Sequence, residues 1–522
     1  MGAQRERSAG GERLPDLVMR NVKAEHLRIG SVTESHLAVL VILVGVVLRL
    51  RLYLRGASLY LDEAMLANNI VDRSYAGFFQ PLDYDQGAPL GFLFLQKLVI
   101  QTLGNADFKL RLWPLIAGIA ALCLMYPVAR RVLDAPGALI ATALLAICPS
   151  LIFYAATVKQ YSTDVFVSLL LLLAGLVAID GALPRKPLLF LALGGALAVW
   201  LSHPAVFLLA GIGISLALYA LSRRDWSGLA YLLGAAVLWS LAFLVDYLVS
   251  LKALSADESL TRYWQDSFLP MPFWQHLDWL GPAFLRLLDN PGGVPATLAL
   301  VLSSGGIVWL LWKRWPVALV VTLPWLATLA ASAAQRYPFG DRLVLFLLPS
   351  LYLTIGGGAE LAERLAGRVW PHLAIPVSVA IALALMVVVV YGVWTGDRGP
   401  TVEENVKPLL TYVERHKQPD DVVFVYYAAE PSARYYAPFY ELAGIRLVYG
   451  SRHREAPQAY LSEVDRFKGL PRVWVLFSHD CGWCQVDEQD YIVAHLDTLG
   501  MRVVEVKDEG VALYLYDLHA PP

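Results

Sequence analysis

The sequence predicts an α-helical polytopic membrane protein with a C-terminal soluble α/β domain. The 522 residues are 57% hydrophobic and only 16% charged, whereas soluble proteins are about 45–50% apolar and about 25% charged. The charge is also uneven, because about 12% of residues 36–394 are charged against about 26% of residues 395–522. These observations exclude an ordinary soluble enzyme, a disordered chain and a fibrous protein.

Residues 1–35 are polar and mixed in charge, with five acidic and six basic residues, and we expect a cytoplasmic N-terminal segment. The apolar run 36–54 has no small-residue cleavage site after it, which indicates an uncleaved signal anchor rather than a signal peptide. We therefore expect a transmembrane domain at 36–394 and an extracytoplasmic domain at 395–522.

About eleven apolar stretches are long enough to cross about 30 Å of hydrocarbon. The block 187–221 is continuous, and Ser202-His203-Pro204 is the best place to divide it. A further run, 88–103, is interrupted by polar residues and a proline, so we expect an interfacial or re-entrant helix there. The expected spans are 36–54, 109–127, 136–155, 162–180, 187–202, 203–221, 229–250, 294–312, 315–333, 342–358 and 372–394.

Basic residues set the expected orientation, since cytoplasmic connections are rich in Lys and Arg. Every second connection carries a basic pair, and the N-terminal segment lies on the same side. An odd number of spans then puts residues 395–522 on the opposite face, the periplasm or exterior if the membrane is a bacterial inner membrane. The basic pairs are Arg130/Arg131, Arg185/Lys186, Arg223/Arg224, Lys313/Arg314 and Arg364/Arg368.

The C-terminal region alternates strand-like and helix-like runs, which is typical of a small α/β domain. It also contains Cys481-Gly482-Trp483-Cys484, which we interpret as a small structural disulfide rather than a redox motif. The strand-like runs are Val422–Tyr426, Arg446–Val448, Val473–Phe477, Val503–Val506 and Ala512–Tyr516; the helix-like runs are Val402–His416, Ser432–Leu442, Pro457–Phe467 and Glu488–Leu499.

The first outer loop, 55–108, begins with adjacent carboxylates, Asp62 and Glu63, at the start of a short helix. Carboxylates are favoured at a helix N-terminus by the helix dipole, so simple capping is one interpretation. Acidic residues at a membrane surface are costly, however, and are often functional. Further along, Asp85 and Gln86 belong either to a solvated turn or to a substrate site.

Two more polar clusters fall on the same face. Lys159 and Tyr161 lie between the third and fourth spans, and Tyr337 and Arg342 lie between the ninth and tenth. Lys159 could extend to lipid head groups, and Arg342 could form a structural pair with Asp341. Because one topology places all three clusters on the outer face, we expect a shared site of carboxylates and cations.

Such a site suits one reaction class. A carboxylate can take the proton of an acceptor hydroxyl, while fixed cations can bind a phosphate and stabilise it as it leaves. A phosphate attached to a long lipid would lie at the membrane surface. The pattern therefore predicts sugar transfer from a polyprenyl-phosphate donor by single displacement, with inversion at the anomeric carbon.

At these residues the chain resembles the GT-C superfamily of membrane glycosyltransferases, in particular the branch related to protein O-mannosyltransferases and lipid A aminoarabinose transferases. The resemblance covers roughly 36–360 and implies the GT-C fold. The matching stretches are Asp62-Glu63-Ala64, Gln86-Gly87-Ala88-Pro89-Leu90, Arg111-Leu112-Trp113-Pro114, Tyr154 to Tyr161 and Tyr337 to Leu343. The chain departs from the family where Gln86 and Gly87 replace an acid and a lysine and Thr157 replaces a glutamate.

The resemblance implies that Asp62 is the general base and that Glu63 supports it. Phosphate binding then falls to Lys159, Arg342 and Arg55. We expect Gln86, Asp85, Tyr161, Tyr337 and His203 to contact substrate. His203, in the His-Pro pair at a span boundary, could instead mark only a helix break.

The expected partners are a polyprenyl-phosphate sugar, a lipid, glycan or protein acceptor, and membrane lipids. Nucleic acid is excluded, because the net charge is −2 and phosphate backbones require a basic face. No His/Cys cluster has metal-ligand spacing, so we predict no firmly bound metal, with Mg²⁺ or Mn²⁺ as an open alternative. The alternative functions are a transporter or flippase for a lipid-linked sugar and a non-catalytic membrane anchor for the C-terminal domain.

Overall fold

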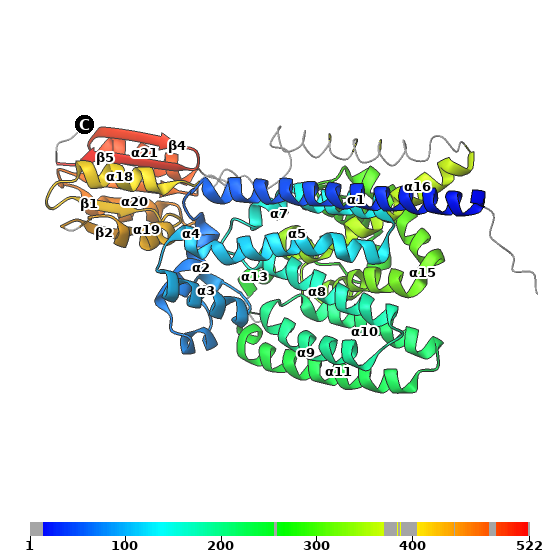
Figure 1. Cartoon of the computed structure of the whole chain (residues 1–522). Helices are drawn as coiled ribbons and strands as arrows, with labels where there is room; N and C mark the ends of the chain where they lie inside the picture. The colour runs from blue at the N-terminus through cyan, green and yellow to red at the C-terminus, as the bar shows by residue number, and fades with distance from the viewer. Residues whose placement is uncertain are drawn as a thin grey trace, which may run out of the picture.

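The computed structural model describes residues 14–254, 258–369, 404–442, 444–479 and 487–519, with 380, 384 and 387 as isolated positions. Long helices form a bundle, and a β-sheet domain lies beyond one end of it, with the short helices α2, α3 and α4 between them (Figure 1). The expected span at 372–394 lies almost wholly outside the described residues, as do Cys481 and Cys484.

Ten helices of the described part of the chain form the bundle. Seven helical stretches of the described residues are long and apolar enough to cross a membrane, so the chain is an integral membrane protein. The helices fall where the apolar runs predict them, but the count of eleven spans stays a prediction. They are α1 (Leu14–Leu54), α5 (Leu112–Val132), α6 (Ala135–Ile147), α7 (Pro149–Tyr154), α8 (Tyr161–Asp180), α9 (Arg185–Leu201), α10 (Ala205–Ser222), α11 (Trp226–Asp246), α15 (Ala296–Ala333) and α16 (Leu348–Val369).

Three expected spans differ in detail. The span at 136–155 is two helices, because the chain leaves helical geometry at Cys148 (φ −59°, ψ 119°) and restarts at Pro149. Proline has no N–H to donate and suits the first turn of a new helix. The runs 294–312 and 315–333 form one element, α15, bent at Arg314 (φ −155°, ψ 74°). The predicted division at residues 202–204 is confirmed, since α9 ends at Leu201 and α10 begins at Ala205.

The bundle is closely packed where glycines meet backbone. A methyl group at Gly306 of α15 would overlap the Thr354 carbonyl oxygen of α16, and one at Gly358 would overlap the Leu302 carbonyl oxygen. Small residues let membrane helices approach this closely. The α15–α16 contact therefore depends on glycine at both positions.

Basic links gather at one end of the bundle. Arg131 and Arg314 lie 2.9 and 2.6 Å from Asp180, at the end of α8, and Arg364 lies 2.7 Å from Asp134. Three of the five predicted basic connections therefore share one end. The start of α8, next to Lys159, lies at the other end, which agrees with the expected separation of the basic links from the polar clusters.

Arg49 lies in the first span and outside the pattern of basic pairs. It is 1% exposed and donates hydrogen bonds of 3.0 Å to the carbonyl oxygens of Ala146 and Leu145, at the C-terminal end of α6. Because a helix C-terminus carries partial negative charge, a buried arginine is stabilised there. Its role is structural.

The outer segments contain the shorter elements. Between α1 and α5 lie α2 (Leu61–Asp72), α3 (Leu90–Leu103) and α4 (Asp107–Leu110), with short 3₁₀ turns at Ala76–Phe79 and Asp83–Asp85. Between α11 and α15 lie a π-helical turn (Tyr247–Leu251) and helices α12 (Lys252–Leu254), α13 (Glu258–Tyr263) and α14 (Leu277–Asp289). An apolar helix at 88–103 is confirmed, whereas its depth in the membrane stays a prediction.

A mixed five-stranded sheet forms the C-terminal domain, in the order β2-β1-β3-β5-β4. β1 pairs in parallel with β2 and β3, and β5 pairs antiparallel with β3 and β4. The predicted strands and helices are confirmed within one to four residues at most ends. They are β1 (Val422–Val425), β2 (Arg446–Tyr449), β3 (Val473–Ser478), β4 (Met501–Asp508), β5 (Val511–Asp517), α18 (Val406–His416), α19 (Glu430–Tyr436), α20 (Gln458–Val464) and α21 (Glu488–Leu499).

The sheet domain and the first outer loop share one apolar core. Leu66 of α2 and Phe92 of α3 belong to the same buried cluster as Val425 of β1 and Trp474 of β3, and α19 packs directly on α2. Burying such side chains contributes about 1.5–3 kcal/mol each. Helix α2 is therefore held between the membrane bundle and the sheet.

Candidate active site

Helix α2 positions the candidate site, and both of its ends are held by other elements. At its start, the N–H of Leu61 donates to Glu404 Oε2 at 2.8 Å, and at its end the ammonium of Lys97 donates to the carbonyl oxygens of Ile70 and Val71 at 2.9 Å. The first N–H groups and the last carbonyl groups of a helix have no partner within it. The helix dipole also favours the negative Glu404 at the start of α2 and the positive Lys97 at its end. The first turn of α2 is thus fixed in place.

Glu63 faces inward from this first turn. Its carboxylate accepts from Arg111 Nε at 3.0 Å and Nη2 at 2.6 Å, and from the Val158 N–H at 2.6 Å. The side chains of Glu63 and Arg111 are only 2% and 7% exposed. Glu63 therefore ties α2 to the segment before α5 and to the 154–161 segment, and its support of a catalytic base stays a prediction.

Asp62 faces the opposite way, toward the predicted cations. Its Oδ2 lies 3.0 Å from Arg342 Nη2 and 3.6 Å from Lys159 Nζ. Lys159 Nζ also donates to Gln86 Oε1 at 2.6 Å. The structure thus brings together Asp62, Lys159, Arg342 and Gln86, which come from four separate segments of the sequence.

The two cations control the charge of Asp62. Burial raises the pKa of Asp62, but the charges of Lys159 and Arg342 and a hydrogen bond from Gln86 outweigh burial and hold that pKa below its usual value. Burial lowers the pKa of Lys159, an effect that Asp62 opposes and Arg342 reinforces. Asp62 is therefore ionised at neutral pH, the state that a general base requires.

Aromatic side chains surround Arg342. Its guanidinium lies 5.5 Å from the centroid of the Trp264 ring, a cation–π contact, and within hydrogen-bonding reach of Tyr161. Tyr337 donates to the Leu343 carbonyl oxygen at 2.7 Å. The contact of Arg342 with Asp62 replaces the structural pair with Asp341 that the sequence left open.

The remaining predicted residues are not among the contacts of Asp62. Arg55 and Asp85 are solvent-exposed, and their roles in substrate binding stay predictions. His203 lies between α9 and α10, where its Nε2 is 3.9 Å from Asp246 Oδ2. It therefore belongs to a second, deeper group of polar side chains rather than to the contacts of Asp62.

Sequence reasoning missed several residues that support the site. Arg111 was quoted only as part of a motif, yet it holds Glu63. Glu404 and His479 come from the C-terminal region, where His479 Nδ1 lies 2.6 Å from Glu404 Oε1. The Arg-Leu motif could have indicated Arg111, but nothing local to Glu404 or His479 indicates a contact with α2.

A metal does not fit the described donor set. Among the described residues, no group of three or more His, Cys, Asp or Glu side chains could hold a metal ion. Glu63 is committed to Arg111, which leaves Asp62 as the carboxylate facing two cations. The mechanism proposed below therefore uses no metal-dependent step.

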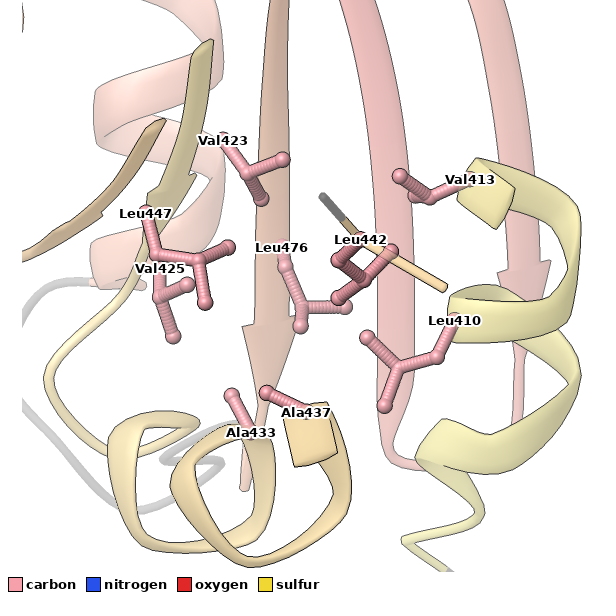
Figure 2. A pocket seen from close by; sticks show the side chains of 9 residues that line it. All are labelled: Leu410, Val413, Val423, Val425, Ala433, Ala437, Leu442, Leu447 and Leu476. Carbon is pink, nitrogen blue, oxygen red and sulfur yellow. The ribbon is translucent and has the colours of Figure 1, made fainter. Parts of the chain in front are cut away.

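A cavity elsewhere has the wrong lining for this chemistry. Figure 2 shows it inside the C-terminal domain, between the sheet and helices α18 and α19. Every lining side chain is apolar, so no group is available to orient a polar ligand. The lining residues are Leu410, Val413, Val423, Val425, Ala433, Ala437, Leu442, Leu447 and Leu476.

Comparisons with known proteins agree with this architecture. The crystal structure of apo ArnT from Cupriavidus metallidurans superposes with a TM-score of 0.55 at 15% identity, covering 94% of this chain and 98% of that one. ArnT bound to undecaprenyl phosphate gives a TM-score of 0.52 at 14% identity, covering 93% and 97%. The chain has the fold of these ArnT structures. The GT-C fold expected from the sequence is thereby confirmed.

A family model and a further solved structure also match the chain. The family model for dolichyl-phosphate-mannose-protein mannosyltransferase matches residues 87–249, a range that contains Lys159 and His203 but neither Asp62 nor Arg342. The Archaeoglobus fulgidus oligosaccharyltransferase in complex with Zn and sulfate has a TM-score of 0.49 at 13% identity, covering 92% of this chain and 73% of that one. Among curated protein sequences, none matches the chain significantly.

Proposed function

We propose that this GT-C protein is an inverting glycosyltransferase that moves a sugar from a polyprenyl-phosphate donor to a lipid, glycan or protein acceptor at the outer membrane face. One observation carries the proposal: a single carboxylate oxygen, Asp62 Oδ2, lies within 4 Å of both Arg342 and Lys159. The GT-C fold, shared with an ArnT structure that binds undecaprenyl phosphate, supports the choice of donor.

The proposed reaction is a single displacement. Asp62 takes the proton of the acceptor hydroxyl, whose oxygen forms a bond to the anomeric carbon. The bond from that carbon to the phosphate oxygen breaks, and its electron pair leaves with the polyprenyl phosphate. Lys159 and Arg342 stabilise the negative charge on this leaving group.

Donor binding also prepares the base in this mechanism. Without donor, the two cations hold the pKa of Asp62 low, which makes Asp62 a weak base. A donor phosphate competes for Lys159 and Arg342, so their attraction for the Asp62 carboxylate weakens and its pKa rises. Asp62 then becomes more basic at the moment when the acceptor hydroxyl is to be deprotonated.

Transfer by purified, lipid-reconstituted protein tests the proposal, with undecaprenyl phosphate carrying mannose, glucose or aminoarabinose as donors and mass spectrometry of the acceptor pool. Asp62→Asn should lower the transfer rate about 10²–10⁴-fold, the usual contribution of a general base. Asp83→Asn is the matched control, because Asp83 lies in the same loop and pairs with Arg73 at 3.0 Å.

Full activity of Asp62→Asn would contradict the role of Asp62 as base. Movement of a donor across the bilayer without transfer would favour the transporter alternative instead. The donor and acceptor that together give product identify the transferred sugar and the class of acceptor.

A further inference from the structure

A second group of polar side chains lies among the membrane helices and takes no part in the mechanism above. Asp164 is on the first turn of α8, Ser202 and His203 join α9 to α10, and Asp246 ends α11. Asp164 is 5% exposed, and Ser202 and Asp246 are 0% exposed. Buried ionisable residues in a membrane domain are costly and are retained where they have a function.

Several polar atoms of these side chains have no well-formed hydrogen bond to the described residues. Within the described part of the chain, Asp164 Oδ1, Ser202 Oγ, His203 Nε2 and both carboxylate oxygens of Asp246 have no partner of acceptable geometry. Ser202 faces Asp164, and the closest charged approach is the 3.9 Å between His203 and Asp246. Because folded proteins pair nearly all buried polar groups, such a concentration of unpaired atoms indicates that a ligand supplies the missing partners.

The group is continuous with the Asp62 site. Tyr161 is one helical turn before Asp164 on α8 and lies within reach of Arg342, which contacts Asp62. Arg342 Nε is itself buried and unpaired within the described residues. Unsatisfied polar atoms therefore continue from the proposed phosphate site to Asp246, where a π-helical turn begins at Tyr247, a distortion frequent at functional sites.

The chemistry of these atoms selects one class of ligand. Two carboxyl groups supply no cation to hold a phosphate, and an apolar prenyl chain would leave every polar atom unpaired. Sugar hydroxyls can donate to Asp164 and Asp246, and they can also accept from Ser202 and His203. A polyhydroxyl group next to the phosphate site fits both the position and the donor–acceptor balance.

We propose that Asp164, Ser202, His203 and Asp246 form the subsite that binds the sugar of the polyprenyl-phosphate donor, while Lys159 and Arg342 bind its phosphate. This inference rests on the proposed function, because it divides one donor between two neighbouring sites. It assigns recognition of the sugar to helices α8 to α11.

Binding measurements with two kinds of probe separate the two sites. Undecaprenyl phosphate carrying mannose, glucose or aminoarabinose reports on both sites, whereas bare undecaprenyl phosphate reports on the phosphate site alone. We expect Asp164→Asn and Asp246→Asn to weaken binding of the preferred glycosylated carrier about 10- to 100-fold, since each leaves a buried sugar hydroxyl without its acceptor, and to leave binding of bare carrier unchanged. Arg342→Gln should weaken both probes.

Asp180→Asn is the matched control, because Asp180 lies on the same helix, at its far end, and pairs with Arg131 and Arg314. In the absence of donor, Asp164→Asn should leave the melting temperature unchanged, since the Oδ1 atom that it replaces has no partner among the described residues. A purely structural carboxylate would instead lower it. Ser202→Ala provides a second variant that introduces no new polar group.

The proposed subsite would be overturned if the Asp164 and Asp246 variants lost affinity equally for bare and glycosylated carrier. It would also be overturned if these variants bound the glycosylated carrier normally. If wild-type protein transfers sugar while these variants behave normally, the subsite alone is wrong. If wild-type protein neither prefers a glycosylated carrier nor transfers its sugar, the proposed function itself is wrong.

Discussion

Replacing Arg111 by methionine should loosen the helix that carries Asp62. The substitution leaves the buried Glu63 carboxylate with backbone donors only, the Val158 N–H at 2.6 Å and the Tyr60 N–H at 3.4 Å. Removing one partner of a buried ion pair costs about 3–5 kcal/mol, because the remaining charge stays buried without compensation. The site is therefore expected to lose its geometry without losing any group that contacts substrate.

Replacing Glu63, the other partner of the pair, by glutamine should cost less stability. In Glu63→Gln the guanidinium of Arg111 keeps its hydrogen bonds to the carbonyl oxygens of Ala57 at 2.7 Å and Ser58 at 2.9 Å. The double variant Glu63→Gln/Arg111→Met should be more stable than the sum of the two single losses predicts. Contacting residues usually show such coupling at about 0.5–3 kcal/mol.

Hydrogen exchange of the backbone amides in α2 measures this loss locally. A cost of about 3–5 kcal/mol corresponds to exchange faster by a factor of about 10² to about 4 × 10³, since each 1.4 kcal/mol is a factor of ten. Arg434→Met is the control, because Arg434 and Asp72 form an exposed pair, 54% exposed on each side and 3.7 Å apart, of the kind worth at most about 1 kcal/mol. Equal exchange in the Arg111 and Arg434 variants would refute the reasoning.

Three further predictions follow from contacts around the site. The hydrogen bond to Glu404 raises the pKa of His479 above 6.5 in the folded protein. The stabilisation from protonated His479 is therefore complete below pH 6.5 and is lost as the pH rises through the folded pKa. The melting temperature should fall between these two pH values, and this fall should be absent in His479→Gln. Trp264→Ala removes a cation–π contact of Arg342 worth about 0.5–2 kcal/mol, so steady-state kinetics should show a higher KM for the donor and a lower kcat, because Arg342 both binds the phosphate and stabilises it as it leaves. Gly306→Ala should lower the melting temperature, because its methyl group would overlap backbone of α16; an unchanged value would contradict the close α15–α16 packing.

Short sequence patterns predicted the helices and strands whose position depends on contact with hydrocarbon or water. The long apolar runs predicted the helices, and short strand-like runs predicted strands such as β1 and β3 almost to the residue. These features follow from short windows of sequence, because hydrocarbon and water select them residue by residue. Breaks such as the one at Cys148 and Pro149 depend on a single proline and were placed less well.

The candidate site was predicted in part. Asp62, Lys159 and Arg342 could be singled out because charges at the outer ends of spans are unusual, and the structure brings them into contact. Asp164 and Asp246 were not singled out, since each is a lone acid in or beside an apolar helix. Only the tertiary structure shows that Asp164 on α8 and Asp246 on α11 both have carboxylate oxygens without a hydrogen-bond partner among the described residues.

The sequence by itself determined that the chain crosses a membrane, that a sheet domain follows, and that acids and cations lie at one face, because hydropathy and charge act locally. Only the tertiary structure decided which carboxylate faces the cations: Asp62 points to Lys159 and Arg342, while Glu63 is buried against Arg111. It also decided that Glu404, far along the chain, holds the start of α2. Such pairings depend on how helices and sheet pack together, and spacing along the sequence carries no information about them.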